Sequence, residues 1–320
     1  MRLLKQPVEV YWRSRLGVQL KGPEEALLDD ENFSLVGLDR YLVGRSLLEA
    51  ADIDSQFEAE KLMGHLPMGA TGQTVLKQQY DAAQKVKERA SSYWHQYAFE
   101  LPAQSIEVVL AMPWGDVRVS AEITALRQTQ NQSEHATLYA DGVPTLQIST
   151  RPGAVATGHK DQQTARADFL VNLWPSHVLL CAAGWNLQSV AVGLDGVAVL
   201  PAISAQNAKL LLIKWFKVYA HAWAQPLPVT FKAGLAFVSE QICQKQLGKE
   251  TENQKIIELA LEKARKEFSD GFSESTDFAR SLYVQRSFDH FDSLLDGLPI
   301  WAPLLYADLI HAATMQVGEL

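Results

Sequence analysis

Between residues 117 and 125 the chain alternates strictly between apolar and polar side chains, and this pattern constrains the fold more than any other feature of the sequence. The apolar positions are Val117, Val119, Ala121, Ile123 and Ala125, and the polar ones are Arg118, Ser120, Glu122 and Thr124. A period of two places the apolar residues on one face of a β-strand. The sequence therefore predicts a strand over 117–126, preceded by a strand over 106–111 across the turn PWGD.

Two further strand pairs follow. Residues 136–140 and 145–150 are joined by the turn DGVP, and residues 189–192 and 197–200 flank LDG. A helical stretch over 162–183, bent or broken near Pro175, separates these pairs. Strands that are interrupted and followed by helices indicate an α/β fold with a mixed sheet. The fold is α+β-like, because the strands and most of the helices lie in separate parts of the chain.

Helical periodicity dominates on both sides of this core. The expected helices are 8–16, 35–51 and 73–97 before it, and 205–223, 230–246, 254–268 and 301–317 after it. We therefore expect three parts: a helical lobe over residues 1–100, an α/β core over 101–200, and a helical part over 201–320. The last part is expected to pack with the core as one domain.

The composition is that of an ordinary globular chain, with 47% hydrophobic and 21% charged residues among 320. Cys181 and Cys243 cannot form a disulfide framework or a zinc site by themselves, which favours a reducing compartment. The longest apolar stretch, 298–313, is short and contains Asp308. We therefore expect neither a signal peptide nor a membrane span.

The net charge of −8 is concentrated in one segment. Residues 20–60 contain eleven acidic residues and three basic ones, whereas the remaining 26 basic and 26 acidic residues balance. A nucleic-acid partner requires clustered Lys and Arg, and such a cluster remains possible outside the acidic segment. The net charge alone therefore excludes no partner.

The stretch GHLPMGATGQT, residues 64–74, has the glycine spacing of a phosphate-binding loop. Gly64, Gly69 and Thr71 fit the pattern GxxxxGK[ST], but Ala70 occupies the position of the lysine that neutralises the phosphate. The simpler interpretation is a turn made by the glycines and Pro67, followed by a helix that begins near Thr71. We expect no nucleotide to bind here.

Three stretches together resemble a known family. They are LLKQPVEVYWRSRLGVQL, ENFSLVGLDRYLVGRSLLEA and LPMGATGQTV, which follow one another in that order. They are similar to the start of the C-terminal domain of the exodeoxyribonuclease V gamma subunit, RecC. In that family a helix ending in an RLG-type sequence precedes an acidic linker, a GLxRY-like segment and an LPxGxxG turn. The similarity continues, more weakly, through VLLCAAGW.

The resemblance implies a core related to the PD(D/E)XK nucleases. Such a site needs two acids on adjoining strands to hold a divalent metal, and a lysine two residues after the second acid. In VSAEITAL the first acid position falls on Thr124, and in LQISTRP the second falls on Ser149 and the lysine on Arg151. Glu122 is the nearest acid on the first strand. The resemblance therefore implies a catalytically degenerate core with no metal.

Five basic residues near this core are candidates for DNA contact, and they are Arg118, Arg127, Arg151, Lys160 and Arg166. A degenerate nuclease cleft can keep its phosphate-facing cations after it loses its metal, because positioning and chemistry use different residues. The alternative is that these are scattered surface charges, and the sequence leaves both interpretations open.

Other catalytic patterns are absent from the sequence. There is no GxSxG nucleophile elbow and no HExxH pair. Asp289, His290 and Asp292 lie close in sequence, but a single turn does not make a metal site.

The function expected from the resemblance is that of a non-catalytic domain. It contributes to assembly with RecB and RecD and guides DNA in an ATP-driven helicase and nuclease, which processes double-strand ends for recombinational repair in the bacterial cytoplasm. The domain itself is expected to need no cofactor and to bind no ATP. The alternatives are an independent metal-dependent nuclease and a protein-interaction scaffold that does not touch DNA.

Overall fold

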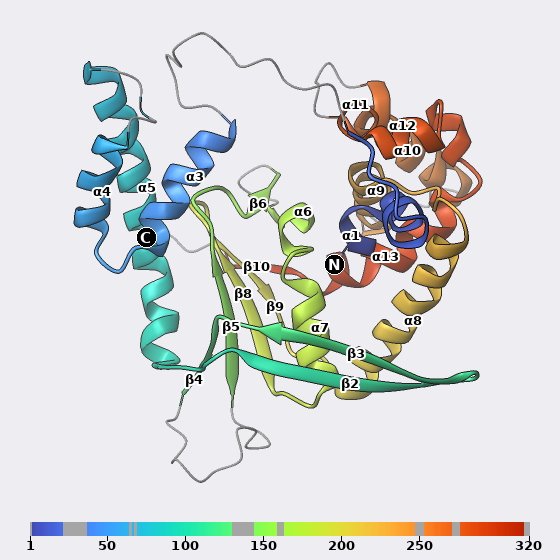
Figure 1. The fold of residues 1–320 in the computed structure, drawn as a ribbon, viewed down its shortest axis with the longest axis horizontal. Coiled ribbons are helices and arrows are strands. Elements are labelled where there is room, and N and C mark those ends of the chain that lie inside the picture. The colour runs from blue at the N-terminus through green and yellow to red at the C-terminus, as the bar shows by residue number, and fades with distance from the viewer. Residues whose placement is uncertain are drawn as a thin grey trace.

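The structure is a computed structural model that describes residues 2–21, 37–63, 66, 69–129, 144–158, 163–246, 253–270 and 276–316. Its centre is a six-stranded sheet with helices on both faces (Figure 1). The expected strand over 136–140 lies outside the described residues.

The order of strands in the sheet is β1 (Phe99–Glu100), β4 (Leu126–Gln128), β5 (Thr145–Thr150), β8 (Leu187–Val192), β9 (Val197–Leu200) and β10 (Thr314–Gln316). The β5 and β8 strands are parallel, and the other neighbours are antiparallel. The prediction of a mixed α/β sheet is therefore confirmed. The nuclease-like character of this core stays a prediction.

A hairpin of two long strands, β2 (Gln104–Met112) and β3 (Gly115–Ile123), forms a separate two-stranded sheet. Met112 pairs with Gly115, so the turn is two residues long, and the hairpin extends past α7 and α8 as a narrow ribbon (Figure 1). The predicted single strand over 117–126 is wrong at its end. Ala125 has a φ of 60°, and this left-handed residue separates β3 from β4, which joins the main sheet.

One face of the sheet is covered by the helices α3 (Gly37–Glu49), α4 (Ile53–Leu62) and α5 (Gly69–Gln96). The buried residues of α5 include Leu76, Ala83, Val86 and Ala90, which recur at helical spacing and form one stripe. This stripe and α3 pack on valine, leucine and isoleucine side chains of β5, β8 and β9.

The other face carries the larger core. Its helices are α6 (Ala167–Leu170), α7 (Trp174–Ala182), α8 (Ala205–Ala224), α9 (Phe231–Gln246), α10 (Asn253–Arg265), α11 (Asp277–Arg280), α12 (Leu282–Ser287) and α13 (Leu298–Ala312). Helix α8 begins after Ser204, whose side-chain oxygen accepts a hydrogen bond from the Asn207 N–H at 3.2 Å and so caps the helix.

The first helices of the chain pack with this second group. They are α1 (Arg2–Lys5), α2 (Pro7–Glu9) and a π-helical turn, Val10–Arg15. The Tyr306 hydroxyl donates a hydrogen bond to the Leu4 carbonyl at 2.9 Å, and the Trp12 indole N–H donates to the Ser287 hydroxyl at 2.8 Å. The first helices of the chain and α13 thus belong to one core.

Two predicted helices are wrong in part. The prediction over 162–183 includes Thr164–Ala165, which is strand β7 and pairs with β6 (Ala156–Thr157). The prediction over 301–317 runs through β10, which pairs with β9 and so satisfies backbone groups that a longer helix would have bonded internally. No helix within the described ranges is long and apolar enough to cross a membrane.

Candidate functional site

The candidate site lies at the carboxyl ends of the parallel strands β5 and β8. In open α/β sheets this edge is where ligands generally bind. Arg151 follows β5, and its N–H donates to the Val192 carbonyl at 2.9 Å. The Leu194 N–H donates to the Gly153 carbonyl at 3.0 Å, so the two strand ends hold each other in place.

Two guanidinium groups and one carboxylate meet at this edge. Arg166 and Asp168 form a two-pronged ion pair, with N···O distances of 3.1 and 2.6 Å. The Arg151 guanidinium lies over the Phe169 ring, 4.6 Å from its centroid. Burial, followed by the neighbouring charge of Arg166, lowers the pKa of Arg151. Burial raises the pKa of Asp168, but the hydrogen bond and charge of Arg166 outweigh it and leave this pKa below its usual value.

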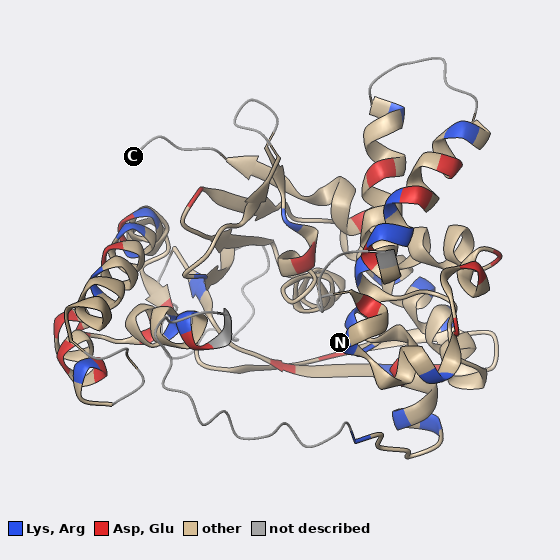
Figure 2. Cartoon of the chain, turned by 90° about the horizontal axis from the view of Figure 1, so that it is seen from above, with Lys and Arg blue, Asp and Glu red and all other residues tan. Residues whose placement is uncertain are grey.

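A second carboxylate stabilises the loop that follows β5. The Asp195 carboxylate accepts hydrogen bonds from the Val155 and Ala156 N–H groups at 2.7 and 3.0 Å. The charges of Asp195 and Asp168 both act on Arg151. The two arginines at this edge of the sheet are therefore balanced by two carboxylates, Asp168 and Asp195. Basic and acidic residues are likewise interspersed along the helices on both sides (Figure 2).

The positions predicted for the degenerate metal site lie beside the pairing of β4 with β5. Thr124 is exposed in the link between β3 and β4, and Ser149 is half-buried in β5. The Ile148 N–H donates to the Ala125 carbonyl at 3.2 Å, which extends the antiparallel register of these strands toward Thr124 and Ser149. Both positions carry hydroxyls, which cannot replace ionised carboxylates as metal ligands.

The nearest acid of the first strand, Glu122, belongs to the separate hairpin. It is exposed and lies opposite Ser105 in the β2–β3 register. Within the part of the chain that the structure describes, no three His, Cys, Asp or Glu residues are grouped so that they could hold a metal ion.

The other candidate cations are placed apart from Arg151 and Arg166. Arg118 lies in β3, with 74% of its side chain exposed, 3.5 Å from the Glu107 carboxylate. Arg127 lies in β4 and donates to the Tyr97 and Ala98 carbonyls at 2.7 and 3.0 Å, which ties the end of α5 to the sheet. Lys160 lies outside the described residues. Whether any of these residues binds DNA stays a prediction.

Beneath the site lies a buried polar network that the sequence analysis missed. The Gln147 amide donates to the Ser176 hydroxyl at 2.9 Å, and the Ser189 hydroxyl donates to the Gln147 carbonyl oxygen at 3.2 Å. His177 Nδ1 lies 2.8 Å from the same Ser189 hydroxyl. The available signal was the presence of Gln147 and Ser189 within otherwise apolar strand sequences.

His177 is fully buried in this network. Burial lowers its pKa from 6.5 to about 4, with a small opposing effect from a hydrogen bond to the Pro201 backbone. The imidazole is therefore neutral at neutral pH and joins α7 to β8. With both His177 and Ser189 fully enclosed, the network has the geometry of a structural bridge between helix and sheet.

The glycine-rich stretch is described only in part, because Gly64 lies outside the described residues. Helix α5 begins at Gly69, which has a φ of +70°, two residues before the predicted start at Thr71. Ala70 in its first turn supplies no cation.

Comparison with known proteins defines the class to which this sheet and its helices belong. The family model of the RecC C-terminal domain matches residues 1–242, and the chain therefore belongs to that family. The chain is similar to the RecBCD enzyme subunit RecC of Escherichia coli (strain K12), with 27% identity over 243 residues. It also matches the RecBCD enzyme subunit RecC of Haemophilus influenzae (strain ATCC 51907 / DSM 11121 / KW20 / Rd), with 25% identity over 113 residues.

These matches cover unequal shares of the compared chains. The E. coli match includes 74% of this chain and 18% of that protein, and the H. influenzae match includes 35% and 10%. The chain thus corresponds to less than a fifth of the E. coli relative. Helix α13 and the C-terminal strand β10 lie beyond the residues that the family model matches.

Proposed function

We propose that this chain acts as a non-catalytic C-terminal domain of a RecC subunit. In this proposal it assembles with RecB and RecD in the bacterial cytoplasm and guides DNA during double-strand break repair by homologous recombination. The observation that carries the proposal is the family match over residues 1–242. The names of both relatives, RecBCD enzyme subunit RecC, support the partners.

The absence of catalysis is proposed from the residues at the β4–β5 pairing. Thr124 and Ser149 present hydroxyls where a nuclease of the related type has carboxylates, and Arg151 is at the lysine position. The test is cleavage of single- and double-stranded DNA by the purified chain with magnesium or manganese. We expect no cleavage. Metal-dependent turnover that is lost in Glu122→Ala would support the alternative of an independent nuclease.

A role in guiding DNA is proposed from the two neighbouring guanidinium groups. Arg151 and Arg166 lie together at the sheet edge, and phosphate contacts contribute most when they follow a common path. The opposing observation is that Arg166 is already paired with Asp168. The competing function is therefore a scaffold whose arginines only stabilise the strand ends.

The experiment is a triple substitution, Arg151→Ala, Lys160→Ala and Arg166→Ala, in the complex assembled with RecB and RecD. DNA affinity is measured at several salt concentrations. Each lost phosphate contact flattens the log–log salt dependence by about one unit and weakens binding without changing sequence preference. Lys85→Ala, an exposed lysine of α5, is the control. Unchanged affinity and slope in an intact complex would favour the scaffold.

We also propose that the chain uses no nucleotide or other cofactor, because Ala70 replaces the phosphate-neutralising lysine. Equilibrium titration with ATP and magnesium is expected to show no binding. Micromolar affinity that disappears in Thr71→Ala would contradict this.

A further inference from the structure

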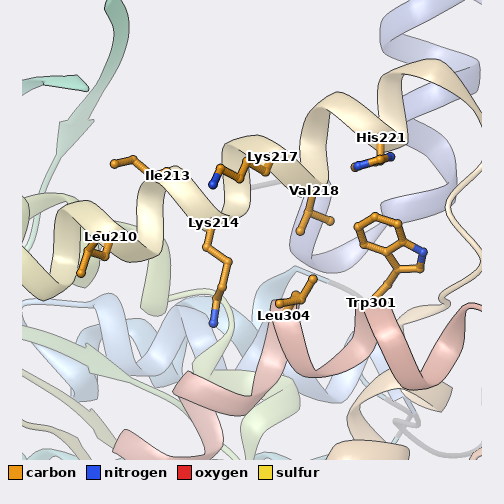
Figure 3. Close-up of a pocket in the computed structure, with 8 residues that line it drawn as sticks. All are labelled: Leu210, Ile213, Lys214, Lys217, Val218, His221, Trp301 and Leu304. Atoms are coloured by element: carbon orange, nitrogen blue, oxygen red, sulfur yellow. The ribbon is translucent and has the colours of Figure 1, made fainter. Parts of the chain in front are cut away.

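Helices α8 and α13 border an open groove on the molecule's surface (Figure 3). It is a hollow of about 440 Å³ whose lining residues on α8 are Leu210, Ile213, Lys214, Lys217, Val218 and His221, with Trp301 and Leu304 on α13. The α8 residues recur at the spacing of one helical face. The His221 and Trp301 rings lie 4.6 Å apart between centroids and close one end.

The groove continues along α8 toward the start of that helix. A second hollow of about 510 Å³ shares Leu210 and Lys214 with the first and extends to Asn207. Lys214 forms an ion pair with Asp308 where the two hollows meet. From Asn207 to His221 the helix advances by roughly 20 Å, at about 1.5 Å per residue. That length accommodates about four turns of a second helix.

One apolar side chain of the groove is largely exposed, whereas Val218 is buried and Ile213, Trp301 and Leu304 are half-buried against the core. Leu210 is 57% exposed, and Ile300, in the first turn of α13, is 58% exposed. Leu210 lines both hollows. Ile300 lines neither hollow, so Leu210 is the exposed apolar side chain that the groove offers to another protein.

The charged residues that α8 contributes to the groove, Lys214 and Lys217, are both basic, and the acidic residue of the lining, Asp308, belongs to α13. Helix α8 has twenty residues and contains Lys209, Lys214 and Lys217 and no acidic residue, in a chain whose net charge is −8. Within the described residues, Lys209 and Lys217 form no ion pair, whereas Lys214 is paired with Asp308. The free amines therefore favour an occupant that carries carboxylates beside its apolar face.

We propose that the groove between α8 and α13 binds an amphipathic helix of a partner protein, with apolar residues against Leu210 and Trp301 and carboxylates facing Lys209 and Lys217. A helix in an apolar groove is a recurrent form of protein recognition, in which apolar anchors recur every three to four residues. The proposal goes beyond DNA guiding, because this groove lies on helices and not at the strand ends that carry Arg151.

The first test uses two synthetic helical peptides of about fourteen residues, a length set by the four turns of the groove. They share an apolar face, which is bordered by glutamates in one and by lysines in the other. We expect the glutamate peptide to bind the chain at least tenfold more tightly in fluorescence anisotropy. Leu210→Glu and Lys217→Glu are expected to weaken it at least tenfold.

Leu62→Glu is the matched control, because Leu62 on α4 is an 87% exposed leucine away from the groove. Its affinity for the peptide is expected to equal that of the unchanged chain. All three variants change exposed residues, so their thermal unfolding is expected to match that of the unchanged chain. Binding of neither peptide, or equal binding by all variants, overturns the proposal. The proposal is also overturned if a single-stranded oligonucleotide binds in place of the peptides and this binding is lost in Lys217→Glu.

A second test asks where the occupant comes from, and this part rests on the proposed function. The complex with RecB and RecD is treated with a carbodiimide, which joins lysine amines to carboxylates in contact. We expect Lys209 or Lys217 to be coupled to a helical segment of another subunit. If the chain assembles but neither lysine is coupled, these subunits do not supply the occupant. If the chain does not assemble, the proposed function fails, while the peptides still decide whether the groove binds a helix.

Discussion

The two faces of the six-stranded sheet are formed by the same strands but are packed in different ways. On the face toward α3 and α5, the strands contribute buried apolar residues, including Leu146 and Val190. On the face toward α7, the adjacent residues Gln147 and Ser189 bond to one another and to that helix. The first face is held mainly by apolar contact, with hydrogen bonds from Arg89 and Arg127 at its margins, whereas the second has a hydrogen-bonded network in its interior.

This difference indicates what each face contributes. Apolar packing is non-directional and tolerates sliding, whereas a satisfied polar network accepts one arrangement of its members. The network joins β5 and β8 at Gln147 and Ser189, three residues before the last residue of each strand. We infer that apolar packing supplies stability on both faces, and that the polar network on the α7 face also fixes the position of β5 relative to β8.

The largest effect is expected on the apolar face. Leu146 is fully buried, and Leu146→Ala is expected to lower the free energy of unfolding by about 3 kcal/mol, because it loses buried area and leaves a cavity. Urea unfolding followed by circular dichroism measures this. Leu62→Ala, at an 87% exposed leucine, is the control and is expected to change stability by less than about 0.5 kcal/mol. Similar losses in both variants would contradict the assigned role of this face.

The next effect distinguishes the polar face by its response to pH. His177 has a folded pKa of about 4 against an ordinary value of 6.5, so between these values the unfolded chain binds more protons. The contribution of His177 to the free energy of unfolding is complete above pH 6.5 and is lost as the pH falls toward 4. We expect a loss of about 2 kcal/mol between pH 7.5 and pH 5.

His177→Asn is the matched variant for this measurement. Asparagine retains a polar atom near the position of Nδ1 and does not titrate. The part of the decrease in unfolding free energy toward acid pH that is due to His177 is therefore expected to disappear. Equal slopes in the two proteins would mean that folding does not shift the pKa of the histidine, and would contradict its burial as a neutral group.

A smaller effect is expected from the centre of the network. Ser189→Ala removes the hydroxyl that lies 2.8 Å from His177 and 3.2 Å from Gln147, and is expected to cost about 1.5 kcal/mol. In a double-mutant cycle with His177→Asn, the two losses are expected to be non-additive by at least about 0.5 kcal/mol. Additive losses would show that the two side chains act independently.

The smallest effect concerns the link between the hairpin and the sheet. Ala125 has a φ of 60°, which is unfavourable for a residue with a Cβ. Ala125→Gly is expected to raise the free energy of unfolding by about 0.5 kcal/mol, since the relief of strain exceeds the added entropy of the unfolded chain. Ala121→Gly, in the regular part of β3, is expected to destabilise instead.

Much of this architecture could be predicted from local patterns. The strand over 145–150 has the bounds of β5, and the strand over 197–200 has those of β9, because turn residues mark their ends. The alternation over 117–125 predicted a strand, and the turn PWGD correctly joined it to the strand before it, but the separation of this hairpin from the main sheet was not predicted. A period of two defines which residues share a face, and it carries no information on which sheet the strand joins.

The candidate site, like the fold, could be predicted only in part. Arg151 was singled out because the family resemblance places it at the lysine position of the nuclease site, and a patch shared with Arg166 was expected if the domain guides DNA. The network of Gln147, Ser189 and His177 was not predicted, because it depends on the parallel register of β5 with β8 across about forty residues of chain. Such a register is decided by the packed core and not by either strand alone.

The packing of the first helices of the chain against α13 affects how this protein folds during synthesis. The Leu4 carbonyl bonds with a tyrosine 302 residues later, and the edge strand β10 pairs with β9 only after residue 316 is present. At roughly 5–20 residues per second, a ribosome takes about 15–60 s to cover that separation. The apolar side chains of α1 and α2 therefore emerge long before their partners, which makes this interval the natural point for a chaperone to act.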